Sequence, residues 1–172
     1  MKKDIRNRFK NMSNNPEFKE FEDFPGLLLW QLQHLWQRRL NTTLEPYKIT
    51  HMQFLMLSAL EIYLSTGMEA TQANFAKALK FDIMMTSNVL RKLEERKFIT
   101  RETNPSDTRS MLLDITLEGR TIVKNTRKIV DKFNNEFFGS IGDDLKVFIQ
   151  SMLGLINSNY EEKVVKNKPE TI

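Results

Sequence analysis

The sequence predicts a mainly α fold that contains one small β hairpin. Two observations carry this prediction. Apolar residues recur every three or four positions through most of the 172 residues, which is the period of amphipathic helices. Between residues 98 and 116 the period changes to alternation, which is typical of short, half-buried strands. We therefore expect a set of packed helices with a single hairpin beyond the middle of the chain.

Composition narrows the class of protein. The chain is 40% hydrophobic and 28% charged, so it can bury a core as one domain or two small lobes. Cys is absent, which excludes disulfides and thiolate chemistry and fits a reducing compartment. The basic N-terminus is followed by no apolar block of signal-peptide type, and no run of about 20 apolar residues occurs. We expect a cytoplasmic protein with no membrane segment, whose net charge of +4 favours polyanions only weakly.

The first part of the chain predicts an arm and two helices. Residues 1–23 mix charged and aromatic residues without a sustained period, so we expect an irregular or partly helical arm. From about 24 to 44 the apolar positions have helical spacing, and Pro46 closes the segment. Thr50 and Gln53 then form a capping box, which should begin a second helix.

The middle of the chain predicts a pair of helices followed by the hairpin. Thr71 and Asp82 are the expected N-caps of a short helix through Leu79 and of a longer one through about Arg96. Residues 98–103 and 109–116 are expected to be the strands. They are joined by the turn-forming residues Asn104, Pro105, Ser106 and Asp107.

After the hairpin, the sequence predicts two long helices. Thr116 should cap a helix that runs to about Phe138, and glycines should interrupt it before Asp143 begins the last helix. The last helix carries a wide apolar stripe, formed by Leu145, Phe148, Ile149, Met152, Ile156 and Tyr160. The tail from Lys163 is polar and is expected to fray.

The order of short helix, turn, second helix and charged hairpin is that of a winged helix-turn-helix. A helix fits the major groove of B-DNA, and a basic hairpin tip can reach the adjacent minor groove. On the second helix, Thr86, Val89, Leu90 and Leu93 share a face that should pack on the domain. Ser and Asn can pair with base edges, Arg and Lys can neutralise phosphates, and Met can touch thymine methyls. The expected DNA contacts of this helix are Met84, Met85, Ser87, Asn88, Arg91 and Lys92.

The hairpin tip adds a second candidate contact, made of Ser106, Asp107 and Arg109. We expect the Asp107 carboxylate to hold Arg109 with its planar guanidinium aimed at a narrow minor groove. The alternative is that this pair is an ordinary surface ion pair of little energetic weight, and that the charges of the helix form a solvated face. The coincidence of helix, hairpin and their order favours DNA binding.

Four short motifs between Thr71 and Arg120 resemble the multiple antibiotic resistance regulator (MarR) family. The family shows Leu-x-x-Asp, Leu-Glu-x-Arg-x-hydrophobic, Asp-x-Arg-Ser and Leu-Thr-x-x-Gly-Arg. Here these motifs stand at residues 79–82, 93–98, 107–110 and 115–120, the last with Ile115 in place of Leu. The resemblance is specific over this window, and the order and length of the helices extend a weaker similarity to most of the chain.

This resemblance implies a homodimeric transcription regulator whose first and last helices pack with those of a second copy. It also implies a small-molecule effector bound between a dimer lobe and a winged lobe. The apolar stripes of the terminal helices are wide for a monomer, although they could form an ordinary core. We divide the chain into an arm at 1–23, a dimerisation helix at 24–48, a winged helix-turn-helix domain at 49–116, C-terminal dimerisation helices at 117–165 and a tail at 166–172.

An enzyme is not expected. The two histidines, His34 and His51, lie on different expected helices, and no metalloprotease, phosphate-loop or dinucleotide motif accompanies them. We predict a regulator, most often a repressor, without metal or cofactor, that binds double-stranded DNA at half-sites about one turn apart. One alternative is a protein-interaction module that has lost high-affinity DNA binding and uses Ile83, Met84 and Met85 as an apolar contact. A small-molecule-binding protein with incidental DNA contact is another.

Overall fold

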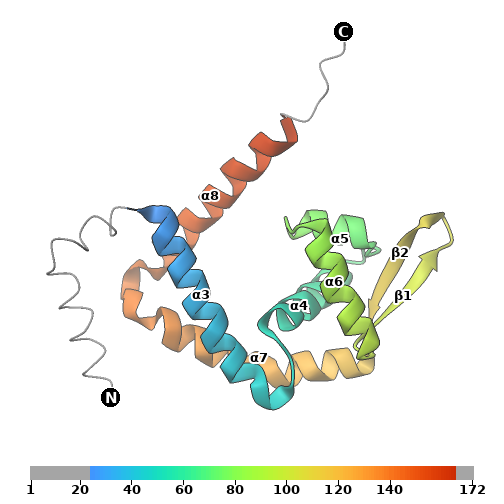
Figure 1. Cartoon of the computed structure of the whole chain (residues 1–172), viewed down its shortest axis with the longest axis horizontal. Coiled ribbons are helices and arrows are strands. Elements are labelled where there is room, and N and C mark those ends of the chain that lie inside the picture. The colour runs from blue at the N-terminus through green and yellow to red at the C-terminus, as the bar shows by residue number, and fades with distance from the viewer. Residues whose placement is uncertain (1–23, 166–172) are drawn as a thin grey trace, which may run out of the picture. The chain divides into compact units, whose positions relative to one another are not determined.

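The computed structural model describes residues 24–165, with side chains as far as Tyr160. The arm expected at 1–23 and the tail at 166–172 lie outside the described residues. The chain divides into two compact units between Thr42 and Thr43. Most of helix α3 (Pro25–Leu44) belongs to the first unit, and all later elements belong to the second (Figure 1). No helix in the described part is long and apolar enough to cross a bilayer.

The second unit contains a helix-turn-helix followed by a hairpin and two long helices. The helix-turn-helix and hairpin comprise α4 (His51–Ser65), α5 (Gln72–Ala78), α6 (Ile83–Glu95), β1 (Ile99–Asn104) and β2 (Asp107–Ile115). The long helices are α7 (Leu117–Phe138) and α8 (Leu145–Val165), and two 3-10 turns, η1 (Glu45–Tyr47) and η2 (Gly139–Asp144), complete the order. This architecture confirms the predicted mainly α fold with a small β wing.

Side-chain caps set the starts of four helices. Thr50 and Gln53 form the predicted capping box of α4, with both reciprocal bonds present at 3.2 and 3.1 Å. The Oγ1 atom of Thr71, the Oδ1 atom of Asp82 and the Oγ1 atom of Thr116 each accept a bond from the backbone N–H three residues on. Each cap satisfies an N–H that the first helical turn leaves without an intrahelical acceptor. The predicted N-caps of α4, α5, α6 and α7 are therefore confirmed.

The hairpin is anchored to the helices along one edge. β1 and β2 are antiparallel, with Ile99 opposite Ile115 and Arg101 opposite Leu113. The Leu113 N–H donates to the Ala70 carbonyl at 2.7 Å, next to an isolated bridge between Thr71 and Leu112. The segment before α5 therefore pairs with β2 and covers that edge of the sheet.

The core of the second unit joins helices α4 to α7 and the inner face of the hairpin. Contacts connect α4 with α6, α7 and β2, and connect α5 and α6 with the strands. Its buried apolar side chains include Phe54, Leu57, Leu60, Phe75, Leu90, Leu93, Ile99, Leu113, Ile115, Val123 and Phe133. Because these come from every element of the helix-turn-helix and hairpin, the position of α6 is set by a continuous core.

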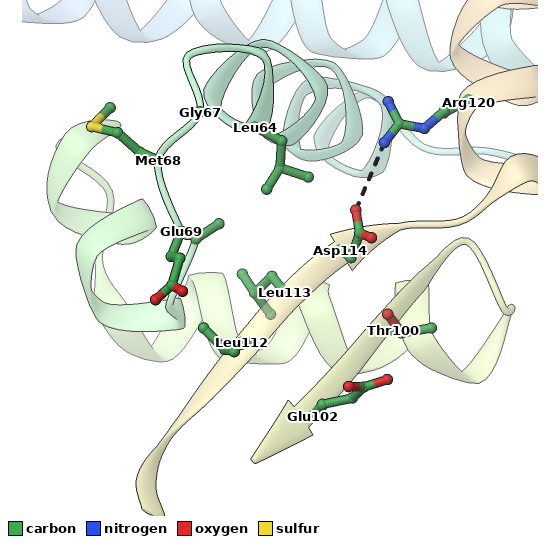
Figure 2. Close-up of a pocket in the computed structure, with 11 residues that line it drawn as sticks. Leu64, Gly67, Met68, Glu69, Thr100, Glu102, Leu112, Leu113, Asp114 and Arg120 are labelled. Atoms are coloured by element: carbon green, nitrogen blue, oxygen red, sulfur yellow. Dashed lines mark ion pairs between the residues drawn. The ribbon is translucent and has the colours of Figure 1, made fainter. Parts of the chain in front are cut away.

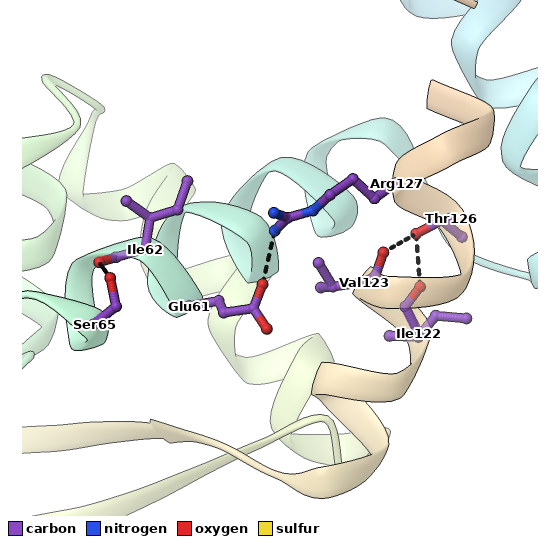
Figure 3. A network of polar contacts seen from close by, with 7 residues as sticks. All are labelled: Glu61, Ile62, Ser65, Ile122, Val123, Thr126 and Arg127. Atoms are coloured by element: carbon purple, nitrogen blue, oxygen red, sulfur yellow. Dashed lines mark hydrogen bonds and ion pairs between the residues drawn. The ribbon is translucent and has the colours of Figure 1, made fainter. Parts of the chain in front are cut away.

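Helix α7 is held to α4 by a polar contact as well as by apolar packing. The Arg127 Nη2 atom lies 2.7 Å from the Glu61 Oε2 atom on α4, and the two side chains point toward each other in Figure 3. The buried Thr126 hydroxyl donates to the carbonyls of Ile122 and Val123 within α7. A buried hydroxyl on this helix thus has its partners inside its own helix.

Two glycines determine how α7 begins and how α8 follows it. A Cβ atom on Gly119 would lie 2.1 Å from the Phe98 carbonyl oxygen, so only glycine allows α7 to approach the start of the hairpin this closely. Gly142, at φ 62°, interrupts the helical path between α7 and α8. Helix α8 starts at Leu145, two residues later than the predicted Asp143, because residues 139–144 form a 3-10 segment.

Candidate nucleic-acid interface

The turn between α5 and α6 orients the candidate recognition helix α6. Lys80 adopts φ 55° in this turn, and the Phe81 N–H donates to the Ala76 carbonyl at 3.0 Å. The Lys80 ammonium donates to the Asn157 Oδ1 atom at 2.5 Å and lies 5.0 Å from the ring centroid of Tyr160. The Lys80 side chain therefore connects the turn to α8. Its backbone is in the left-handed region, which costs energy for any residue that has a Cβ atom.

Helix α6 has one buried face and one exposed face, as the sequence predicts. Thr86, Leu90 and Leu93 are fully buried, and Val89 on the same predicted face is half-buried. The exposed residues of the candidate site on this helix are Met84, Asn88, Arg91 and Lys92, whereas Met85 and Ser87 are half-buried. The structure therefore brings the predicted polar and basic residues together on one face, with Met85 and Ser87 at its margin.

The N-terminus of α6 is open on its outward side. Ile83 is 60% exposed and Met84 is 72% exposed, although both are apolar. The Asp82 cap satisfies the Met85 N–H at 2.8 Å. The remaining N–H groups of the first turn and the positive end of the helix dipole suit a phosphate group.

The C-terminus of α6 is anchored by residues that sequence reasoning did not single out for this role. The Arg96 Nη1 atom donates to Gln53 Oε1 at 3.1 Å, and the Arg96 guanidinium lies 4.6 Å from the Phe98 ring centroid. Gln53 thus serves the cap of α4 and the end of α6 at once. Lys97, at φ 60°, ends α6 by a left-handed turn in which the Phe98 N–H donates to the Leu93 carbonyl. These contacts fix the C-terminal end of α6 to α4 and to the start of the hairpin.

The tip of the hairpin is a turn at Pro105 and Ser106. The Asn104 Oδ1 atom accepts a bond from the Ser106 N–H at 2.8 Å, which closes the turn. Ser106, Asp107 and Arg109 are all exposed at this tip. The strands extend further toward the turn than predicted, because Asn104 and Asp107 still pair across it.

The predicted contact between the Asp107 carboxylate and the Arg109 guanidinium is wrong, because the carboxylate binds the backbone of Arg109 instead. The Asp107 Oδ1 atom accepts a bond from the Arg109 backbone N–H at 3.1 Å. Within the described part of the chain, no ion pair joins the two side chains. The carboxylate therefore shapes the backbone of the tip and leaves the guanidinium of Arg109 exposed.

The outward face of the hairpin carries mainly acidic side chains. A hollow of about 500 Å³ lies over this face, and Figure 2 shows Glu69, Glu102 and Asp114 around it with apolar side chains between them. Arg120 offsets part of this charge, at 3.7 Å from the Asp114 carboxylate. Since carboxylates repel phosphates, this face of the hairpin is poorly suited to a polyanion, in contrast to the exposed Arg91 and Lys92 of α6.

Known proteins share this arrangement. The model of the MarR family matches residues 49–111. YdcH, an uncharacterised HTH-type transcriptional regulator of Bacillus subtilis (strain 168), is 38% identical over 116 residues, which are 67% of this chain and 79% of YdcH.

Two solved structures with DNA are also similar. The S. aureus MepR–DNA complex superposes with a TM-score of 0.69 at 26% identity, covering 79% of this chain and 98% of that chain. The transcriptional repressor CouR, bound to a 23-mer DNA duplex, superposes with a TM-score of 0.68 at 25% identity, covering 80% of this chain and 95% of that chain. The motifs, the fold and the similarity to YdcH agree, and the chain therefore belongs to the MarR family.

Proposed function

We propose that this protein is a sequence-specific DNA-binding transcription regulator that acts as a homodimer. The observation that carries the proposal is the exposed face of α6, where Asn88, Arg91 and Lys92 lie on a helix whose opposite face is fully buried. A helix held in this way can enter the major groove without disturbing its core. The DNA complexes of MepR and CouR, which have the same fold, support this use of the surface.

The proposed contacts divide by chemistry. Arg91, Lys92 and Arg109 neutralise phosphates or enter a groove, and Asn88 with Ser87 pairs with base edges. The expected contact set also includes Met84, Met85, Ser106 and Asp107. In this set Asp107 acts by shaping the tip through its bond to the Arg109 N–H. Met84 at the exposed helix start offers its thioether side chain to a thymine methyl.

The homodimer is supported by apolar side chains that the single chain leaves exposed. On α8, Ile149, Leu153 and Ile156 are 44%, 53% and 51% exposed, and their spacing of four and three places them on one stripe. On α3, Leu29 and Trp30 are 64% and 60% exposed. We propose that both helices pack with those of a second copy, which covers these side chains. Repression and control by a small-molecule effector belong to the same proposal and rest on family membership.

Salt dependence tests the function. DNA from upstream of the gene is labelled, and its affinity is measured as salt rises from about 50 to about 200 mM. We expect the logarithm of the affinity to fall linearly with the logarithm of the salt concentration. Arg91→Ala and Lys92→Ala should each reduce the magnitude of this slope by about one. Lys132→Ala, which removes a charge from an exposed site on α7, is the matched control and should leave affinity and slope unchanged.

A protein-interaction module is the second candidate, because Ile83 and Met84 expose apolar side chains at the start of α6. Half-buried Met85 contributes less to such a contact than the sequence suggested. An apolar protein contact would hold or strengthen as salt rises, whereas phosphate contacts weaken. If the wild-type protein does not bind upstream DNA in dilute salt, this result would contradict the proposed regulator and favour the protein-interaction module.

A further inference from the structure

Arg101 lies at the point where the hairpin leaves the core. Its cross-strand neighbour is Leu113, which is buried, so Arg101 belongs to the inner face of the hairpin. On the same face of β1, Ile99 is 2% exposed and Thr103 is exposed. Arg101 is therefore the last inward residue of β1 that is covered by the helices before the free tip begins.

The Arg101 guanidinium connects the hairpin to both helices of the helix-turn-helix. Its Nη1 atom donates to Glu94 Oε2 on α6 at 3.4 Å, and its Nη2 atom donates to Gln72 Oε1 on α5 at 3.3 Å. The Arg101 side chain is 17% exposed and the Glu94 side chain is 41% exposed. The Nε atom of Arg101 is buried without a hydrogen-bond partner in the described part of the chain. The planar guanidinium thus presents one nitrogen to each helix in a fixed geometry.

This connection can set the direction of the hairpin. A two-stranded hairpin has little stability by itself, so its angle depends on what holds its base. The apolar core holds the base through Ile99 and Leu113, and at the level of Leu113 the Arg101 side chain adds polar contacts with α5 and α6. Tilting the hairpin about this point would displace the tip, with Arg109, relative to the exposed face of α6.

We propose that Arg101 is a positioning residue for DNA binding, which holds the hairpin at the angle where Arg109 and α6 contact one duplex together. The inference rests on the proposed function, since it concerns how two parts of the same DNA-binding surface are kept in register. A direct phosphate contact by Arg101 is the competing role, and its low exposure together with its two protein partners argues against that role.

A double-mutant cycle on DNA affinity separates the two roles. Arg101→Met keeps an apolar stem and removes the fork, while Arg109→Ala removes the side chain at the tip. We expect each variant to weaken binding about five- to tenfold, and the double variant to bind about as weakly as either one. If Arg101 contacted DNA directly, the losses would multiply to roughly 25- to 100-fold, and that result would overturn the proposal.

Arg101→Lys tests whether charge alone is sufficient. Lysine keeps the positive charge, but it lacks the rigid planar fork that presents one nitrogen to Glu94 and another to Gln72. We expect Arg101→Lys to bind DNA nearly as weakly as Arg101→Met, and full affinity in this variant would contradict a role for the two-ended contact. Lys132→Met, which makes the same change of charge on the exposed surface of α7, should bind like the wild type.

Folding is checked by circular dichroism at the temperature of the binding assay. If Arg101→Met does not fold, Glu94→Gln enters the same cycle with Arg109→Ala, because the half-exposed Glu94 tolerates the change and only the charge of the pair is lost. Multiplicative losses with Glu94→Gln would equally overturn the proposal. Wild-type protein without salt-dependent DNA binding would reject the proposed function, whereas a normal wild type with multiplicative losses would reject the role of Arg101 alone.

Discussion

Helices α6 and α8 differ in how completely a single chain buries their apolar side chains. Helix α6 buries Thr86, Leu90 and Leu93 completely within its own chain and exposes Arg91 and Lys92. Helix α8 leaves large apolar side chains exposed, among them Val147, Ile149, Leu153, Leu155 and Ile156. The helix-turn-helix thus completes its core inside one chain, while α8 does not. We infer that α6, the proposed DNA-contacting helix, needs no partner to fold, and that α8 needs a second chain to cover its apolar surface.

The largest expected effect comes from placing a charge in the stripe of α8. Leu153→Glu puts a carboxylate between Ile149 and Ile156, and burying it would cost about 4 kcal/mol, so self-affinity should fall about 1,000-fold. Sedimentation equilibrium measures this change. Thr108→Glu adds the same carboxylate to an exposed position at the hairpin tip, outside α8, and should leave the dimer intact. A Leu153→Glu protein that remains dimeric would show that this stripe is not the contact.

The next effect concerns the join between the hairpin and α7. Gly119→Ala forces a Cβ atom against the Phe98 carbonyl, so the free energy of unfolding should fall by about 3 kcal/mol. Urea titration followed by circular dichroism measures it. Gly154→Ala is the matched control on α8, where nothing lies within 4 Å, and it should be neutral or raise stability by up to about 1 kcal/mol. Equal effects of the two substitutions would contradict the close approach at Gly119.

The cap of α6 gives a smaller effect. Asp82→Ala removes the acceptor of the Met85 N–H, and we expect a loss of about 1 kcal/mol in the free energy of unfolding. Asp82→Asn retains a capping oxygen and should remain close to the wild type. If thermal unfolding shows the two variants to be equally destabilised, the role of the side chain is other than capping.

The smallest expected effect is a dependence of stability on pH through His51, at the start of α4. Burial lowers the pKa of this imidazole below its ordinary value. The unfolded chain therefore takes up a proton at higher pH than the folded chain, so stability should be full above about pH 6.5 and decrease as the pH falls below it. His51→Gln should remove this part of the acid sensitivity in urea titrations at several pH values. An unchanged pH profile would contradict it.

The parts of the molecule that depend on neighbouring residues could be predicted from the sequence. Caps such as Thr50, Asp82 and Thr116 act on an N–H three residues away, so their chemistry can be recognised in a linear pattern. The inner and outer faces of α6 follow from helical periodicity in the same way.

The contacts that were missed join residues far apart in the chain. Arg101 meets Gln72 29 positions earlier, and Arg96 meets Gln53 43 positions earlier, so no local pattern announces either bond. The Asp107 error has a different cause, because a backbone N–H two residues away competes with the Arg109 side chain for the same carboxylate. The acidic hollow gathers Glu69, Glu102 and Asp114 from three segments that only the folded sheet brings together.

The most direct test of the account is the composition and spacing of the protein–DNA complex. Sedimentation velocity of the complex, combined with a footprint on upstream DNA, measures both. We expect two chains on one duplex and two protected half-sites roughly 10 to 10.5 base pairs apart, centre to centre. One chain on a duplex, or a single protected half-site, would contradict the claim that paired copies of α6 read adjacent major grooves.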